Sequence, residues 1–259
     1  MNIHLLTHKE AFMFKCLKTI VFTVLVLAFA FGSVQAKELI VGVDANFRPF
    51  EFKNDKGEFT GFDVQLFDAI AEDLGIDYKW QTMDFNGIIP ALQSKSIDAA
   101  IAGITIKSSR EEVVDFSHPY YDSGLVILVR ADNEDIKSID DLNDKVVVTK
   151  TATTSVDFLK GVPTKDVKLL PNTDNLFMEL ITGGADAVFF DSPPLMYYAQ
   201  NQGQGKVKVV GPLYQGQPYG IAFPQGSDLR EKVNIALLKM MEDGRYDELY
   251  RKWFGTDPK

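Results

Sequence analysis

The chain has 259 residues, a formal net charge of −9 and a single cysteine, and 46% of its residues are hydrophobic. Such a length suits either one large domain or two lobes of about 100 residues each. The acidic balance argues against nucleic acid and anionic membrane surfaces as partners, because both attract clustered positive charge.

The first 36 residues have the pattern of a secretory signal peptide that is cleaved after Ala36. Lysines precede the apolar run Thr19–Phe31, which is shorter than the roughly 20 residues of a membrane-spanning helix. An uncleaved membrane helix is the alternative interpretation. Cleavage would remove three Lys, one Glu and Cys16, which leaves a net charge of −11 and no thiol. We therefore expect an exported protein of the periplasm without disulfides.

The next segment predicts strands that alternate with helices. A buried strand is expected over Leu39–Asp44, and Phe50–Phe62 is expected to form a hairpin or loop excursion. Apolar residues at helical intervals predict a helix over Phe62–Leu74, and a second helix over Gly87–Ser94 leads to a strand over Ile97–Gly103. This alternation is typical of parallel sheets covered by helices.

A long apolar strand, Ser123–Arg130, interrupts the alternation, which then resumes. Strands are expected over Lys145–Lys150, Ala185–Asp191 and Lys206–Gly211, with a helix over Asn175–Thr182. The middle of the chain therefore contains strand–helix units of its own.

A second long apolar segment, Tyr219–Pro224, precedes amphipathic helices expected over Ser227–Phe254. The two long segments would carry the chain out of one lobe and back again. We therefore expect an α/β fold with two lobes and two hinge strands. The predicted divisions are a signal peptide over 1–36, lobe one over 37–121 and 218–259, and lobe two over 122–217.

Polar residues follow several predicted strands, and ligands of open parallel sheets bind beyond such strand ends. Asp44, Thr105, Lys150 and Asp191 occupy these positions. A free amino acid needs a cation for its carboxylate and a carboxylate for its ammonium, and Arg110 supplies a guanidinium beside the same loops. From the residues alone, a cleft of mixed charge is predicted.

Further residues could complete such a site. The carbonyl of Gly103 lies in the loop that leads to Thr105, and the amides near Thr154 open a helix and could receive an anion. Phe47 and Phe85, each in a loop after a strand, could enclose the aliphatic part of a ligand.

Each of these residues also has an ordinary structural interpretation. Asp191, which precedes Ser-Pro, could cap a helix, and Arg110 beside two glutamates could be a solvated helix charge. The two phenylalanines could belong to the core, and Thr153 and Ser155 could be helix caps. No metal-binding or catalytic motif stands out, so we expect no cofactor and no enzyme activity.

Several sequence blocks occur in the order found in one known family. They are Phe50–Phe52, Gly61–Val64, Met83–Leu92, Ala102–Ile106 with Arg110, Asp115–Ser117, Tyr219–Pro224 and Lys252–Gly255. From about Lys37 to its end, the chain resembles the periplasmic amino-acid-binding proteins of ABC transporters (solute-binding protein family 3), and among them the glutamine-binding members. The resemblance implies the type II periplasmic binding protein fold, whose two lobes close over the ligand like a flytrap.

The resemblance also implies a role for each site residue. Arg110 would bind the ligand carboxylate together with the backbone NH groups of Thr105 and Thr154. Asp191, the Gly103 carbonyl and the Thr105 hydroxyl would bind the ammonium.

At the side-chain end, Asp44 and Lys150 would flank the ligand, and Phe47 and Phe85 would pack on it. A hydrogen-bond acceptor beside a cation suits an amide side chain, so L-glutamine is the implied ligand. The resemblance further implies that the protein is a monomer and that it delivers this ligand to the membrane permease subunits of an ABC transporter.

Two departures from the family pattern leave alternatives open. Ala152 stands where the family has Gly, and Phe190 stands where the glutamine-binding members have His. Another neutral amino acid, or a broader range, is therefore an alternative ligand. Some relatives are arogenate or prephenate (cyclohexadienyl) dehydratases, but those enzymes need a general acid in the cleft, and the intact Arg110–Asp191 pair argues against that activity. A sensor module of a larger protein is a third, less favoured alternative.

Overall fold

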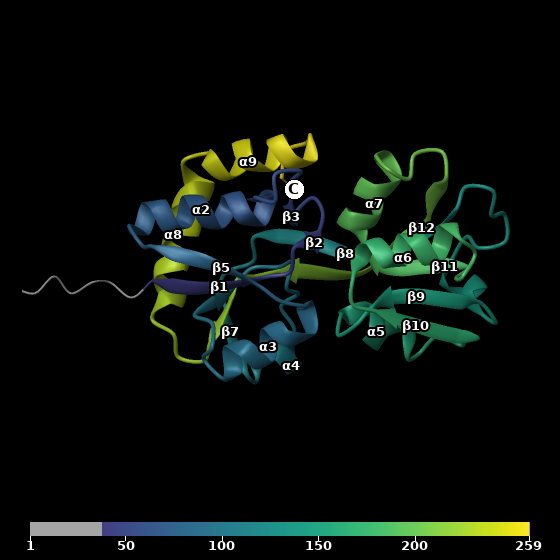
Figure 1. Ribbon diagram of the computed structural model, residues 1–259, viewed down its shortest axis with the longest axis horizontal. Coiled ribbons are helices and arrows are strands. Elements are labelled where there is room, and N and C mark those ends of the chain that lie inside the picture. Colours follow the sequence, from purple (N-terminus) through teal and green to yellow (C-terminus); the bar gives the residue numbers. More distant parts are fainter. Residues whose placement is uncertain (1–37, 259) are drawn as a thin grey trace, which may run out of the picture. The chain divides into compact units, whose positions relative to one another are not determined.

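The computed structural model describes residues 38–258, and its main feature is a pair of five-stranded sheets (Figure 1). The predicted signal peptide over 1–36, with Cys16, lies outside the described residues. No helix among residues 38–258 is long and apolar enough to cross a membrane.

The first sheet has the strand order β5-β1-β6-β13-β7. Strand β1 pairs in parallel with β5 and β6, whereas β13 is antiparallel to β6 and β7. Helices α2, α8 and α9 lie on one side of this sheet, and α3 and α4 lie on the other (Figure 1). The strands are β1 (Leu39–Val43), β5 (Tyr78–Thr82), β6 (Ala99–Ala100), β7 (Val114–Phe116) and β13 (Ala222–Pro224), and the helices are α2 (Phe62–Leu74), α3 (Phe85–Gln93), α4 (Ser108–Glu111), α8 (Leu229–Glu242) and α9 (Arg245–Phe254).

The second sheet has the strand order β10-β9-β11-β8-β12. Strands β10, β9 and β11 are parallel, and β8 pairs antiparallel with β11 and β12. The strands are β8 (Tyr121–Arg130), β9 (Val146–Lys150), β10 (Asp166–Leu170), β11 (Ala187–Asp191) and β12 (Val207–Tyr219), and the helices are the 3-10 helix η1 (Ile139–Leu142), α5 (Thr154–Leu159), α6 (Thr173–Ile181) and α7 (Ser192–Gln200).

Strands β8 and β12 carry the chain between the two sheets. Both belong to the second sheet, and they reach the first one where Tyr121 pairs with Tyr219. A bridge from Thr105 to Tyr219 and a bond from the Gly220 N–H to the Ile104 carbonyl join this end to the first lobe. The predicted two-lobed α/β fold with two connecting strands is confirmed, and the residue borders proposed for the lobes stay a prediction.

A third, small sheet carries Phe47 and Glu51 within the first lobe. Its strands β2 (Asn46–Phe47), β3 (Glu51–Lys53) and β4 (Phe59–Thr60) form antiparallel pairs. The predicted hairpin over Phe50–Phe62 corresponds to β3 and β4.

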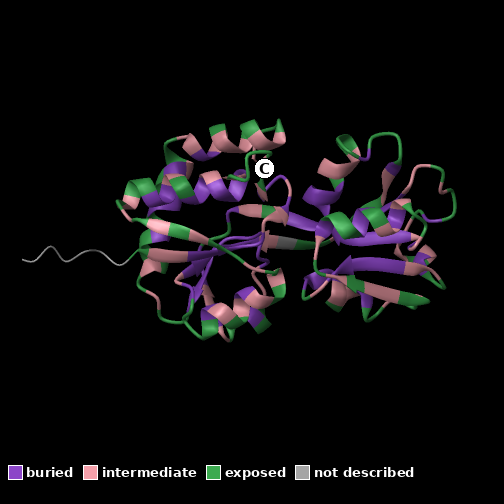
Figure 2. Cartoon of the chain, viewed as in Figure 1, coloured by how far each residue is buried: buried purple, intermediate pink, exposed green. Residues whose placement is uncertain are grey.

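The helix predicted over Phe62–Leu74 has these bounds in the structure, because its apolar spacing and its terminal glycine agree. Its buried residues include Phe62, Leu66 and Ile70, so the apolar stripe faces the core. Gly75 ends the helix in a left-handed conformation that glycine adopts without strain. Figure 2 shows the same division throughout, with buried central strands and helices exposed on their outer faces.

Three predicted strands, over Ile97–Gly103, Lys206–Gly211 and Tyr219–Pro224, are wrong in their bounds. The strand expected over Ile97–Gly103 is confined to Ala99–Ala100, and Gly103 has a left-handed φ that is incompatible with a strand. The segment Tyr219–Pro224 is not one strand: β12 continues to Tyr219, and β13 begins at Ala222. Register shifts interrupt β12 on both sides of Tyr214, which explains why its sequence pattern did not reveal a single long strand.

Candidate functional site

A cavity between the two lobes brings together most of the predicted site residues. It has a volume of about 270 Å³, part of which is open to solvent. Of the nine predicted residues, the eight that line it are Phe47, Phe85, Gly103, Thr105 and Arg110 from the first lobe, and Lys150, Thr154 and Asp191 from the second. The ninth, Asp44, is buried and pairs with Lys150. Their roles toward a ligand remain predictions.

Arg110 is held in the cavity wall by backbone carbonyls. It lies on the short helix α4 with only 6% of its surface exposed. Nη1 donates to the Thr105 carbonyl at 2.9 Å, and Nη2 donates across the cleft to the Ala152 carbonyl at 3.2 Å. Burial lowers the pKa of the guanidinium, and the charge of Asp191 opposes that change. The interpretation of Arg110 as a solvated helix charge is therefore wrong.

Asp191 occupies the N-cap position of α7, yet its side chain makes no capping hydrogen bond. Instead, Oδ2 accepts a hydrogen bond from the Tyr219 hydroxyl. Oδ1 is buried and has no hydrogen-bond partner among the described residues. A buried polar atom in this state is costly, so it points to a group that is supplied from outside the chain.

The pKa of Asp191 reflects the same environment. Burial raises it to about 6, against the opposing effects of the Tyr219 hydrogen bond and the charges of Arg110 and Lys150. The carboxyl group is therefore poised to ionise fully when an additional cation approaches it.

Lys150 and Asp44 form an ion pair that crosses the cleft. Lys150 is the last residue of β9, and Asp44 directly follows β1, so both lie at the carboxyl ends of parallel strands. Their side chains are 2% and 4% exposed. The Lys150 Nζ also lies 5.8 Å from the ring centre of Phe47 and 5.7 Å from that of Phe85. The pair thus places a donor and an acceptor side by side in a largely aromatic surrounding.

Gly103 occupies a position that admits no other residue. Its φ is +53°, and a Cβ atom there would lie 2.4 Å from the Phe47 ring. Across the cleft, Phe47 packs edge-on against Phe190 at a ring separation of 5.9 Å. Phe47 itself is 4% exposed, so it belongs to the core as well as to the cavity wall.

Three lining residues were not predicted as site residues: Ala102, Thr153 and Phe190. Each of them directly precedes a predicted site residue (Gly103, Thr154 or Asp191), and this position in the sequence could have identified them. Thr153 is the N-cap of α5 without a side-chain capping bond, and its hydroxyl donates to the Lys150 carbonyl at 2.7 Å. Ala152 adopts a left-handed φ of +63°.

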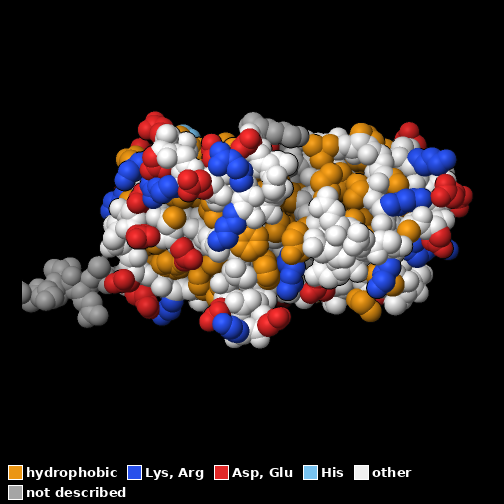
Figure 3. All heavy atoms as spheres, turned by 90° about the horizontal axis from the view of Figure 1, so that it is seen from above, with side chains coloured by type: hydrophobic (Ala, Val, Ile, Leu, Met, Phe, Trp, Pro, Cys, Tyr) orange, Lys and Arg blue, Asp and Glu red, His pale blue; other side chains and the backbone are white. Residues whose placement is uncertain are grey.

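A wider groove lies at the connecting strands, away from this cavity. Its space of about 1340 Å³ includes open solvent, and Tyr121, Met196, Leu213 and Tyr250 are among the residues that line it. Figure 3 views the face with α7 and α9 and shows hydrophobic side chains toward the middle, with charged ones mainly at the ends. We place the candidate site in the cleft because the buried, unpartnered oxygen of Asp191 lies there.

The comparisons with known proteins agree on one family. The family described as bacterial extracellular solute-binding proteins, family 3, matches residues 39–256. The ABC transporter glutamine-binding protein GlnH of Bacillus subtilis (strain 168) is 36% identical over 228 residues, which cover 85% of this chain and 82% of that protein.

Solved structures of similar proteins have different ligands in their descriptions. The arginine-, lysine-, histidine-binding protein ArtJ of Geobacillus stearothermophilus is 36% identical with a TM-score of 0.82, covering 86% of this chain and 97% of its own. An ancestral arginine-binding protein bound to glutamine is 44% identical with a TM-score of 0.79, covering 85% and 98%. The ancestral amino acid-binding protein AncCDT-1, a precursor of cyclohexadienyl dehydratase, is 40% identical with a TM-score of 0.78, covering 84% and 95%.

Proposed function

Because the chain belongs to the bacterial extracellular solute-binding proteins of family 3, we propose that it captures a free L-amino acid, with L-glutamine favoured, for an ABC transporter. The observation that carries this proposal is Asp191: its Oδ1 is buried without a partner in a cavity that Arg110 also lines. A zwitterion supplies the ammonium that Asp191 needs and the carboxylate that suits a guanidinium.

Each end of the ligand's main chain is assigned to residues from both lobes. Arg110 on the first lobe would bind the carboxylate with the NH groups of Thr105 and Thr154. Asp191 on the second lobe would bind the ammonium with the Gly103 carbonyl and the Thr105 hydroxyl. Such a ligand links the lobes, so it favours the closed arrangement by binding it better than the open one.

The Asp44–Lys150 pair supports an amide side chain. An amide offers NH donors to a carboxylate and a carbonyl oxygen to an ammonium, so it can join the pair without adding charge. A ligand arginine would face the positive charge of Lys150, and a ligand glutamate would face the negative charge of Asp44. The apolar ring of Phe190 in the cavity wall makes another neutral amino acid the alternative.

Enzyme activity is the less favoured candidate, although similarity to a precursor of cyclohexadienyl dehydratase keeps it testable. A dehydratase needs an acid that gives up a proton to its substrate. In our proposal Asp191 is ionised in the complex, because it pairs with an ammonium. We therefore propose that the protein binds its ligand without converting it.

A thermal-shift screen tests the proposal. The purified protein is unfolded and refolded to remove bound ligand, then heated with each of the twenty amino acids and with arogenate. A ligand at 100 times its Kd should add about 2.7 kcal/mol of stability. Stabilisation by glutamine is expected; stabilisation by another amino acid would change only the ligand, and silence across all twenty would refute amino-acid capture. Turnover of arogenate would refute the non-enzymatic assignment.

Matched variants test the site. Arg110→Gln and Asp191→Asn should each weaken binding by at least about a hundredfold, because each leaves a charged ligand group unpaired in a buried place. Arg230→Gln and Asp77→Asn remove the same charges from exposed positions and should bind as the parent does. Equal affinity of all four variants would show that the ligand binds elsewhere.

A further inference from the structure

Two carboxylic acids lie buried behind the wall of the cleft. Glu51 on β3 and Asp63 in the first turn of α2 both have 0% of their surface exposed. Each carboxyl group lies close enough to change the pKa of the other. Neither residue lines the cleft cavity, so the proposed ligand contacts leave this pair unexplained.

The hydrogen bonds of the two residues are unequal. Asp63 Oδ2 accepts from the Gly103 N–H at 3.0 Å and from the Tyr120 hydroxyl at 2.8 Å. Its Oδ1 and both carboxyl oxygens of Glu51 have no donor among the described residues. If both groups were ionised, three buried acceptor oxygens would be unsatisfied, and two negative charges would be in contact.

One shared proton removes the charge conflict and leaves only one neutral Glu51 oxygen without a donor among the described residues. A protonated Glu51 can donate to Asp63 Oδ1, and Asp63 then remains the anion that Gly103 and Tyr120 stabilise. The alternative, a proton on Asp63, would forfeit two hydrogen bonds to a charged acceptor, which are stronger than bonds to a neutral one. The geometry therefore favours Glu51 as the acid.

Burial and the surrounding charges also favour the proton on Glu51. Burial raises the pKa of Glu51 well above its usual range; the charges of Asp63 and Asp44 raise it further, and Lys150 opposes them. Burial also raises the pKa of Asp63, and the hydrogen bonds from Gly103 and Tyr120 oppose that rise. Glu51 thus binds the proton more strongly.

We infer that Glu51 and Asp63 hold one proton between them at neutral pH, and that this pair positions Gly103 in the cleft wall. The anion fixes the Gly103 amide, whose residue has a left-handed φ and touches the Phe47 ring. Because Glu51 is uncharged, it adds no further negative charge near the Asp44–Lys150 pair. This inference deepens the proposed function and rests on it only for its effect on ligand affinity.

Infrared difference spectroscopy tests the shared proton without any ligand. The purified protein at neutral pH should show the C=O stretching band of a protonated carboxyl in a non-aqueous environment. Glu51→Gln should remove that band, whereas Glu72→Gln, which changes an exposed glutamate on α2, should leave it. Absence of the band from the parent protein at neutral pH would overturn the inference.

An alkaline titration of the parent protein gives a second reading that needs no variant. Because burial raises the pKa of Glu51, its contribution to stability is lost as pH rises through that raised value. The melting temperature should therefore fall as pH rises from the usual pKa of a glutamate toward the raised value, while the infrared band persists, and the band should decline only as pH passes the raised value. A band that declines at a pH where the melting temperature has not yet fallen would contradict the link.

Ligand titrations then test the positioning role. Glu51→Gln keeps a neutral hydrogen-bond donor to Asp63, so its affinity for the amino acid should stay within about twofold of the parent's. That affinity should also decline less at alkaline pH than the affinity of the parent. Asp63→Asn loses the charged acceptor of the Gly103 amide and should weaken binding about tenfold or more. Parent-like affinity of Asp63→Asn would refute positioning. If the parent itself bound no amino acid, only the proposed function would fail, and the infrared result would still decide the shared proton.

Discussion

At Asp191, one carboxyl group is subject to two opposing influences. Burial favours its neutral form, while Arg110, Lys150 and the Tyr219 hydroxyl favour the ionised form, and the pKa is about 6. A ligand ammonium would add a third favourable charge. Binding should therefore release a proton wherever the unliganded carboxyl is protonated.

We expect the affinity for an amino acid to fall as pH drops below about 6, by at most about tenfold per pH unit. The stability of the ligand-free protein should change with pH in the opposite sense to the affinity. The stabilisation that Asp191 contributes is present below its usual pKa and is lost as pH rises through about 6. Calorimetry in buffers of different ionisation enthalpy would measure the released protons. An affinity independent of pH between about 5 and 7 would contradict this role for Asp191.

Ala152 provides a second prediction for a single residue. Its left-handed φ of +63° costs an L-residue roughly 1–2 kcal/mol, and glycine avoids that cost but loses about 0.5–1 kcal/mol in chain entropy. Ala152→Gly should therefore raise the free energy of unfolding by up to about 1 kcal/mol. Urea denaturation measures it, with Ala199→Gly inside α7 as the control that should destabilise by about 1 kcal/mol. Equal losses in both variants would show that Ala152 is unstrained.

Candidate site residues could be predicted only where their position in the sequence relative to predicted strands marks them. Asp44, Lys150 and Asp191 follow from their places at strand ends, and Arg110 needed the family resemblance to outweigh its glutamate neighbours. Glu51 was not predicted as part of any polar cluster, because nothing in the sequence shows that β3 brings it against α2. A contact between distant segments is a property of the packed chain, not of local pattern.

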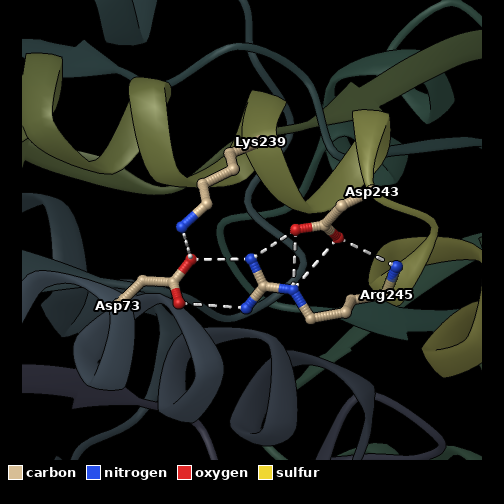
Figure 4. A network of polar contacts seen from close by, with 4 residues as sticks. All are labelled: Asp73, Lys239, Asp243 and Arg245. Carbon is tan, nitrogen blue, oxygen red and sulfur yellow. Dashed lines mark hydrogen bonds and ion pairs between the residues drawn. The ribbon is translucent and has the colours of Figure 1, made fainter.

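At the scale of elements, an ion network joins three helices of the first lobe (Figure 4). Arg245, the first residue of α9, donates from Nη1 and Nη2 to both oxygens of Asp73 on α2, at 3.0 and 2.7 Å. Its Nε donates to Asp243, the C-cap residue of α8, at 3.0 Å. Lys239 on α8 lies 3.6 Å from Asp73.

Replacing Arg245 by Lys should lower the melting temperature slightly, and more at low salt than at high salt. Lysine keeps the charge but cannot form the two-pronged contact with Asp73 while also bonding Asp243. Thermal unfolding at two salt concentrations measures the effect. Arg230→Lys, which changes an exposed arginine in the first turns of α8, should have none. An equal decrease in melting temperature in both variants would show that the loss of any arginine has this effect and that the network is not its cause.

Elements differed in how well their sequences predicted them. Helix α2 combines regular apolar spacing with a terminal glycine, so local rules were sufficient. Strand β12 contains Gly211, Pro212 and Gly216 within one ladder, and these residues ordinarily end strands. Its continuity comes from pairing with β8, which the local pattern cannot show.

At the scale of the whole unit from residue 38 to 258, polar contacts connect the lobes. Besides the Asp44–Lys150 pair and the Arg110–Ala152 bond, the Lys107 Nζ lies 2.8 Å from Asp157 Oδ2. The Lys107 pair is the most exposed of these three contacts, with side chains 30% and 50% exposed. Contacts of this kind exist only when the lobes are together, so they favour the closed state.

Lys107→Ala should weaken ligand binding by about twofold to fivefold, mainly through faster dissociation, because an exposed ion pair contributes little but acts only in the closed state. Lys160→Ala is a matched control: Lys160 contacts the same Asp157 from within the second lobe, at 2.6 Å. Stopped-flow dissociation rates compare the two. A faster rate in both variants, or in neither, would show that the contact between lobes does not hold the cleft closed.

The interleaved strand order of the first sheet has a consequence in time. Strand β13 lies between β6 and β7, although it is made after every strand of the second sheet. During translation, the segment from Tyr121 to Tyr219 is therefore complete while the first sheet still lacks β13, the last of its five strands to be made. A nascent chain that stops short of Ala222 leaves β6 and β7 without the partner between them, so the earliest-made lobe is the last to mature.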